Sequence, residues 1–143
     1  MSQFNTELHN HEKLQILLDR LHVMVVAPAD ALPDRRWCNL FVHEVEAFQE
    51  AMEIHMSAEE KGGYMHELVE LHPELARKAA TLKEEHSKFH TALATLLAAA
   101  RKGEDAAGLR SQIQDFLTEV YEHEVAETDL VQEALQRDIG PAD

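Results

Sequence analysis

The sequence predicts an all-α protein folded as an up-down-up-down four-helix bundle, and three observations predict it. The chain of 143 residues holds only five glycines and four prolines, the residues that most often interrupt helices. No stretch alternates polar and apolar residues for long enough to form a strand. Apolar residues instead recur at steps of three and four, as in helices that share one core. We expect these helices over residues 5–27, 34–70, 74–102 and 106–138.

Three breaks in the sequence separate the four predicted helices. The first, APADALP (27–33), holds two prolines. The second, LHPE (71–74), places Pro73 where a helix can begin. The third, RKGED (101–105), offers Gly103 as a helix stop and Asp105 as the N-cap of the last helix. Nothing else divides the sequence, so we expect one domain over residues 1–143.

Composition excludes several classes of partner. Apolar residues make up 45% of the chain, which is enough for a globular core. The formal net charge of −14 repels nucleic acid and anionic membranes. The first residues, MSQFNTELHN, lack the pattern of a signal peptide, and no apolar run approaches the ~18 residues that cross a bilayer. The single cysteine, Cys38, forms no internal disulfide. We therefore expect a cytoplasmic protein, as a monomer or weak homodimer.

Histidine and glutamate interrupt the apolar seam of every predicted helix. A rise of ~1.5 Å per residue, counted from the connecting turns, gives the height of each polar residue along the bundle. These heights agree to within about one helical turn, except that those of His11 and His55 agree more loosely. The level that they share would bury five imidazoles and two carboxylates. In chain order the residues are His11, His55, Glu59, His86, His90, His123 and Glu127.

Such a layer calls for a bound cation. An unpaired buried charge or polar group costs several kcal/mol. Seven nitrogen and oxygen donors are too many for one tetrahedral zinc ion but suit two metals bridged by two carboxylates. Imidazole and carboxylate without thiolate favour iron or manganese, with zinc as a further possibility. The donors would leave about one position open on two six-coordinate metals. The alternative is that the histidines pack for structure alone.

Other polar residues receive simpler interpretations. His22 lies on the seam of the first helix, and with His43 it forms a weaker candidate for a second site. Tyr64 and Tyr121 are near the polar layer in sequence and could hydrogen-bond to it. Several glutamates are expected on solvated faces, namely Glu60, Glu84, Glu85, Glu122 and Glu124.

The pair Gly62–Gly63 falls inside the second predicted helix. Two glycines within a helix cost about 2 kcal/mol relative to alanine. One hypothesis is that they break or kink the helix and open a path to the metals. The alternative is an ordinary helix end, followed by a separate turn over residues 64–71.

The polar motifs resemble a known family. NHEKLQILLDRL (10–21), HMSAEEK (55–61), EEHSKFH (84–90) and YEHEVAE (121–127) resemble, in order and helix by helix, the motifs of the bacterial branch of hemerythrin-like, or HHE cation-binding, domains. The resemblance implies a hemerythrin-like bundle with an oxo- or hydroxo-bridged, non-haem di-iron centre, and the same seven residues as its ligands. Oxygen carriers of the family end in His-x-x-x-x-Asp, whereas Thr128 occupies that position here and Glu127 precedes it.

The resemblance and the residues together predict a di-iron protein that binds O₂, NO or peroxide. The five histidines would be terminal ligands, and the two glutamates would bridge the irons. Three alternatives stay open: an enzyme that turns over peroxide or NO, a redox, oxygen or NO sensor, and an iron store or scavenger. A dry pocket would surround the site, lined by Leu14, Leu18, Met52, Phe89 and Val120.

Overall fold

The described part of the chain is almost entirely helical. The computed structural model describes the backbone of residues 3–27, 32–60 and 64–139, and the side chains of residues 11–27, 32–58 and 65–137. It contains no strand within these ranges, which confirms the all-α prediction. The helices are α1 (Gln3–Val26), α2 (Asp34–Glu60), α3 (Tyr64–Leu71), α4 (Ala76–Lys102) and α5 (Ala106–Ile139), with a 3-10 turn, η2 (Pro73–Leu75), before α4.

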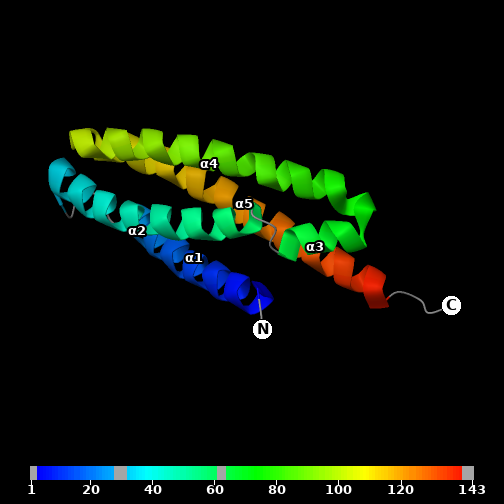
Figure 1. Cartoon of the computed structure of the whole chain (residues 1–143). Helices are drawn as coiled ribbons and strands as arrows, with labels where there is room; N and C mark the ends of the chain where they lie inside the picture. Colours follow the sequence, from blue (N-terminus) through cyan, green and yellow to red (C-terminus); the bar gives the residue numbers. More distant parts are fainter. Residues whose placement is uncertain (1–2, 28–31, 61–63, 140–143) are drawn as a thin grey trace.

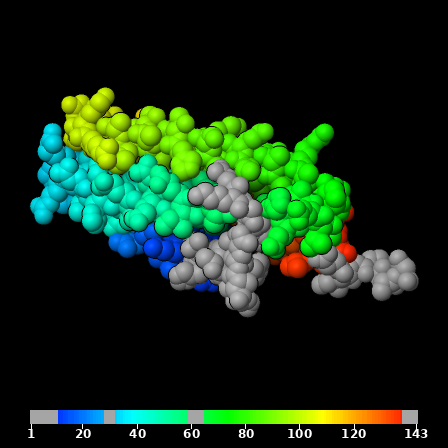
Figure 2. Space-filling view, viewed as in Figure 1, coloured from blue at the N-terminus to red at the C-terminus, as the bar shows by residue number. Residues whose placement is uncertain are grey.

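The four long helices form the predicted bundle. Helix α1 packs against α2 and α5, and α4 packs against the same two helices, so the four enclose one core. Consecutive long helices run in opposite directions (Figure 1). The space-filling view shows α2 and α4 lying against each other along the length of an elongated molecule (Figure 2). Within the described ranges, no helix has the length and apolar character needed to span a bilayer.

The second predicted helix, residues 34–70, is two helices in the structure. Helix α2 ends at Glu60, and α3 begins at Tyr64 and turns toward α4 (Figure 1). Gly62 and Gly63 lie outside the described residues. A break here agrees with the low helix propensity of adjacent glycines.

The helix ends largely follow the predicted signals. Gly103 adopts the left-handed conformation with φ of 69°, and its N–H donates to the carbonyl of Ala100. The N–H of Gly108 donates to Asp105 Oδ1 at 3.0 Å, as expected of an N-cap. Pro73 differs from the prediction, because it begins the 3-10 turn η2, and α4 itself begins at Ala76.

Two apolar clusters fill the interior. The main cluster lies among the four long helices and includes Phe48 and Met52 at its centre. The second cluster lies at the end of the bundle where α3 and η2 pack against α4 and α5. Its buried members are Met65, Leu68, Leu75, Ala79, Leu82, Leu130 and Ala134.

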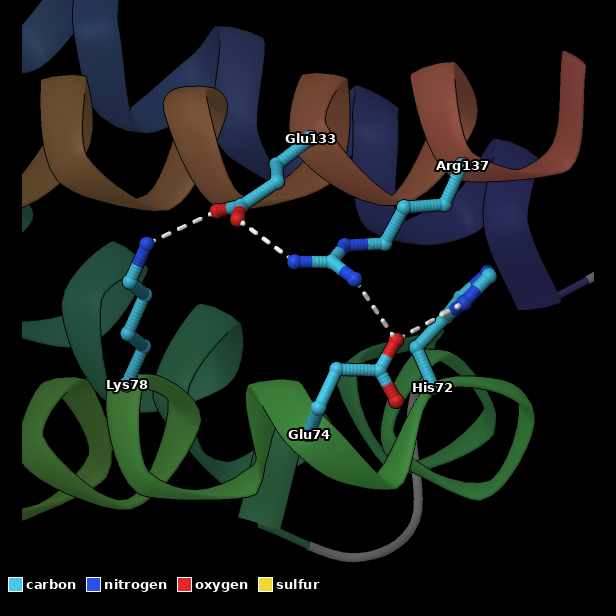
Figure 3. Close-up of polar contacts among 5 residues, drawn as sticks. All are labelled: His72, Glu74, Lys78, Glu133 and Arg137. Carbon is cyan, nitrogen blue, oxygen red and sulfur yellow. Dashed lines mark hydrogen bonds and ion pairs between the residues drawn. The ribbon is translucent and has the colours of Figure 1, made fainter. Parts of the chain in front are cut away.

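Ion pairs on the surface link η2, α4 and α5 at the end of the bundle that holds the second cluster (Figure 3). Lys78 of α4 donates to Glu133 of α5 at 2.8 Å, and Arg137 donates to Glu133 at 3.1 Å. Arg137 also donates to Glu74 at 3.1 Å, and His72 lies 3.5 Å from the same carboxylate. These side chains are mostly exposed, so solvent screening leaves the ion pairs only a small effect on stability. The apolar cluster beneath them contributes more to holding this end together.

The buried aromatic ring of Phe48 provides a test of the main cluster. Phe48 is fully buried and meets Phe116 edge-on, with ring centroids 6.3 Å apart. Phe48→Ala should lower the free energy of unfolding by about 3–5 kcal/mol, because it leaves a cavity in the core. Urea denaturation of the wild-type and variant proteins measures the difference.

Ile54→Ala on the same helix is the matched control. Ile54 is 46% exposed, and its truncation should change the free energy of unfolding by no more than about 0.5 kcal/mol. Equal losses in the two variants would contradict the placement of the core.

Candidate metal centre

A polar layer separates the two apolar clusters. Helix α4 belongs to the second cluster at Leu82 and to the main cluster at Phe89. Helix α5 belongs to the main cluster at Val120 and to the second at Leu130. The side chains that are buried between these points are polar, and α2 adds another at the same level. They are His55, His86, His123, Glu124 and Glu127, each 1–3% exposed.

Four side chains of this level converge on one point. His11, His55, Glu124 and Glu127 each direct one ligand atom into a group whose members all lie within 4.8 Å of one another. His11 Nδ1 lies 2.9 Å from Glu124 Oε2. His55 Nε2 lies 4.0 Å from Glu124 Oε1 and 3.6 Å from Glu127 Oε1. The group therefore gathers two imidazoles from α1 and α2 and two carboxylates from α5.

A second group adjoins the first through Glu127. Its Oε2 lies 3.3 Å from His123 Nε2, while its Oε1 faces His55. The His123 ring is 5.2 Å from that of His86 and 5.1 Å from that of Phe89, measured between centroids. The two oxygens of Glu127 thus face two different sets of imidazoles. This is the arrangement that a carboxylate bridging two cations requires.

The donor set fits a pair of cations. Two carboxylates and at least three imidazoles are buried within one level of the core, where charge without a partner is costly. The donors are nitrogen and oxygen, which suit iron, manganese or zinc. The only thiol, Cys38, lies on α2 more than four helical turns before His55, so sulfur ligation has no part in this level.

The carboxylates hold protons on the imidazoles when no cation is present. Contact with Glu124 raises the pKa of His11, against the opposing effect of burial. Burial alone would lower the pKa of His123, but contacts with Glu127 and Glu85 outweigh it and raise the pKa to about 9. A cation must displace these protons, so its binding competes with protonation at neutral pH.

Most of the predicted ligands share this level. His11, His55, His86, His123 and Glu127 lie within it, including the two on α1 and α2 whose heights matched only loosely. His90 is half-buried on the next turn of α4 and is not among the four converging residues. Glu59 lies near the end of α2, and its side chain is outside the described residues.

One prediction of a solvated glutamate was wrong, because Glu124 is 3% exposed and belongs to the converging group. Glu85 is partly exposed, and its Oε1 also lies 2.7 Å from His123 Nδ1, a contact that the sequence did not indicate. Glu124 could have been found from its spacing, because a residue three positions before Glu127 lies within about 60° of it around the helix. Glu84 and Glu122 are exposed, as predicted, and the side chain of Glu60 lies outside the described residues.

The remaining candidates lie away from the layer. His22 was predicted on a buried seam and is exposed, because the buried face of α1 passes through Leu18, Leu21 and Val25. His43 is also exposed, and the described residues form no metal-binding group around either histidine. The Tyr121 hydroxyl donates to Asp19 at 2.6 Å, away from the imidazoles. Burial and this hydrogen bond raise the pKa of Tyr121 to about 12. The side chain of Tyr64 is not described.

One of the comparisons with known proteins identifies a cation-binding family. Residues 4–135 match the family model described as "Hemerythrin HHE cation binding domain". Comparisons with curated proteins and with solved structures found no match at the significance applied. The family match confirms the resemblance to hemerythrin-like domains over residues 4–135.

The raised pKa values predict a pH-dependent stability for the metal-free protein. Protonated His123 favours the folded state because its pKa is about 9 when folded and about 6.5 when unfolded. This contribution is complete below pH ~6.5 and disappears as the pH rises through ~9. Urea denaturation in the presence of a chelator should show a lower free energy of unfolding at pH 9.5 than at pH 6, both approximate settings for this window.

Two histidine variants separate this effect from other titrations. His123→Gln should reduce the pH dependence, since it removes one shifted group and leaves the raised pKa of His11. His66→Gln alters an exposed histidine of α3 and should preserve it. A wild-type protein that is equally stable at both ends of this range would contradict the assigned charges.

Proposed function

The chain belongs to the hemerythrin HHE cation-binding domain family, and on this premise we propose that it is a non-haem di-iron protein. It binds O₂, or a related small ligand such as NO or peroxide, in the core of the bundle. The observation that carries the proposal is the two-sided placement of Glu127, with one oxygen toward His55 and the other toward His123. In a site for a single metal, a carboxylate would not need to face imidazoles on two sides.

The proposed ligand set has the seven predicted members. Glu127 would bridge the two irons, and Glu59 would be the second bridge. Glu124 is buried beside the set as the partner of His11, 2.9 Å from its Nδ1, because an eighth donor would fill the position left open for a small ligand. The terminal ligands are His11, His55, His86, His90 and His123, and an oxo or hydroxo group completes the bridge. Manganese and zinc accept the same donors, so metal analysis decides among the three.

The protein keeps water and protons away from this site. When bound, a pair of irons supplies one-electron redox chemistry and a position for a small ligand. The surrounding apolar side chains exclude bulk water, which limits proton access and disfavours release of a reduced ligand. The predicted lining residues are all 4% exposed or less, namely Leu14, Leu18, Met52, Phe89 and Val120.

Ligand binding is favoured over catalytic turnover. Turnover of peroxide or NO needs a proton donor near the irons. Tyr121 is poorly suited to that role, because its hydroxyl donates to Asp19 and its pKa is about 12. A sensory role would require an output surface, and iron storage would require more than two irons per chain. The proposal includes no nucleic acid or membrane partner and a monomer or weak homodimer.

Anaerobic iron loading tests the proposal. The wild-type protein should take up about two Fe²⁺ per chain, by metal analysis, because the polar layer offers two adjoining donor groups. Exposure to O₂ should produce a visible charge-transfer band that disappears when O₂ is removed. An irreversible change would favour the redox or sensing alternatives, and a much larger iron content would favour storage.

Two histidine variants, one of a proposed ligand and one of an exposed residue, refine the test. His90→Ala should lose most of one iron and the visible band, yet remain helical by circular dichroism. His43→Ala, an exposed histidine of α2, is the control and should retain both irons. If His90→Ala retains two irons, His90 is not a ligand. A wild-type protein that binds no iron, manganese or zinc would overturn the proposal as a whole.

A further inference from the structure

The two ring nitrogens of His123 face two different carboxylates. Nε2 points into the polar layer, 3.3 Å from Glu127 Oε2. Nδ1 points out of it, 2.7 Å from Glu85 Oε1. Glu127 is part of the converging group, whereas Glu85 comes from α4 and lies outside that group.

Glu85 stands between the buried imidazole and solvent. The His123 side chain has no exposed surface, while that of Glu85 is 36% exposed. Both residues line a groove of about 770 Å³ between α4 and α5, together with Lys88, Phe89 and Glu122. The Glu85 carboxylate therefore contacts the buried imidazole with one oxygen and stays open to solvent on its other side.

The distances from the two His123 nitrogens to Glu85 and Glu127 indicate which nitrogen keeps its proton when a cation binds. A neutral imidazole has one N–H donor and one nitrogen with a lone pair, and only the latter can bind a metal. Of the two carboxylates, Glu85 makes the shorter contact, and it faces solvent rather than the layer. The proton stays on Nδ1, and the lone pair of Nε2 faces the cation position beside Glu127.

We propose that Glu85 is a positioning residue of the metal centre, which holds the Nδ1–H of His123 so that Nε2 presents its lone pair to a cation shared with Glu127. The inference rests on the proposed function and deepens it. Glu85 touches neither the cation nor its ligand and acts only through His123. Carboxylates that orient a ligating imidazole in this way raise its basicity and fix its ring orientation.

Substitution of Glu85 should weaken metal binding without abolishing the site. In competition with a chromogenic chelator under anaerobic conditions, Glu85→Ala should raise the Kd for Fe²⁺ by about 10- to 100-fold. Glu85→Gln should have a smaller effect, because the amide oxygen still accepts the Nδ1–H bond. Glu84→Ala is the matched control, since Glu84 is the preceding residue on α4 and is exposed.

A second readout reports the proton itself. In the zinc-loaded, diamagnetic protein, the Nδ1–H of His123 should give a slowly exchanging proton NMR signal in the wild-type protein and in Glu85→Gln. The signal should be lost by exchange with water in Glu85→Ala. A residue with only a general structural role would not change this one signal selectively. Circular dichroism checks that each variant remains folded, and the Gln variant carries the test if the Ala variant does not fold.

The outcomes separate the two proposals. If the wild-type protein binds iron and Glu85→Ala binds it equally tightly with the Nδ1–H signal unchanged, the positioning role is wrong and the metal centre stands. If the wild-type protein binds none of the metals, both proposals fall together. Weaker binding by Glu85→Ala, with loss of the signal and partial rescue by Gln, supports both.

Discussion

The rest of the polar layer depends on one interaction, the contact of the buried Glu127 carboxylate with imidazoles on both sides. Glu127 is 2% exposed, with His55 near one oxygen and His123 near the other. A charge at this depth is tolerated only with compensating partners, so every helix that reaches this level must supply them. The other polar side chains of the layer follow from this requirement.

The bundle meets this constraint by dividing its core. The main cluster lies on one side of the polar layer and the smaller cluster under α3 on the other, so apolar packing orients the ligands from both directions. Helix α5 contributes most, because His123, Glu124 and Glu127 fall on about one helical turn. Helix α3 packs against η2 and α4 and covers the end of the bundle that holds the second cluster.

Periodicity predicted the bundle and most of the layer, because a buried polar residue on an apolar seam is conspicuous in sequence. The residues of α5 that recur at steps of three and four are all buried, namely Leu109, Ile113, Phe116, Val120, His123, Glu127, Leu130 and Ala134. Glu124 and Glu85 were missed because each lies off the seam, and their burial depends on which neighbouring helix covers that flank. His22 was placed on the seam of α1 and is exposed, because the neighbouring Leu21 occupies the buried face there. Tertiary packing, which periodicity does not encode, decides these flanking positions.

The central claim is that two cations share Glu127, and X-ray absorption at the iron edge of the iron-loaded protein tests it most directly. A shared carboxylate holds the metals close together, so the account predicts nitrogen and oxygen scattering in the first shell and a second iron at about 3.5–4 Å. Substitution of Glu127 by glutamine should remove the iron–iron contribution. Iron that is bound by nitrogen and oxygen with no iron neighbour would contradict the account, because Glu127 would then serve a single metal.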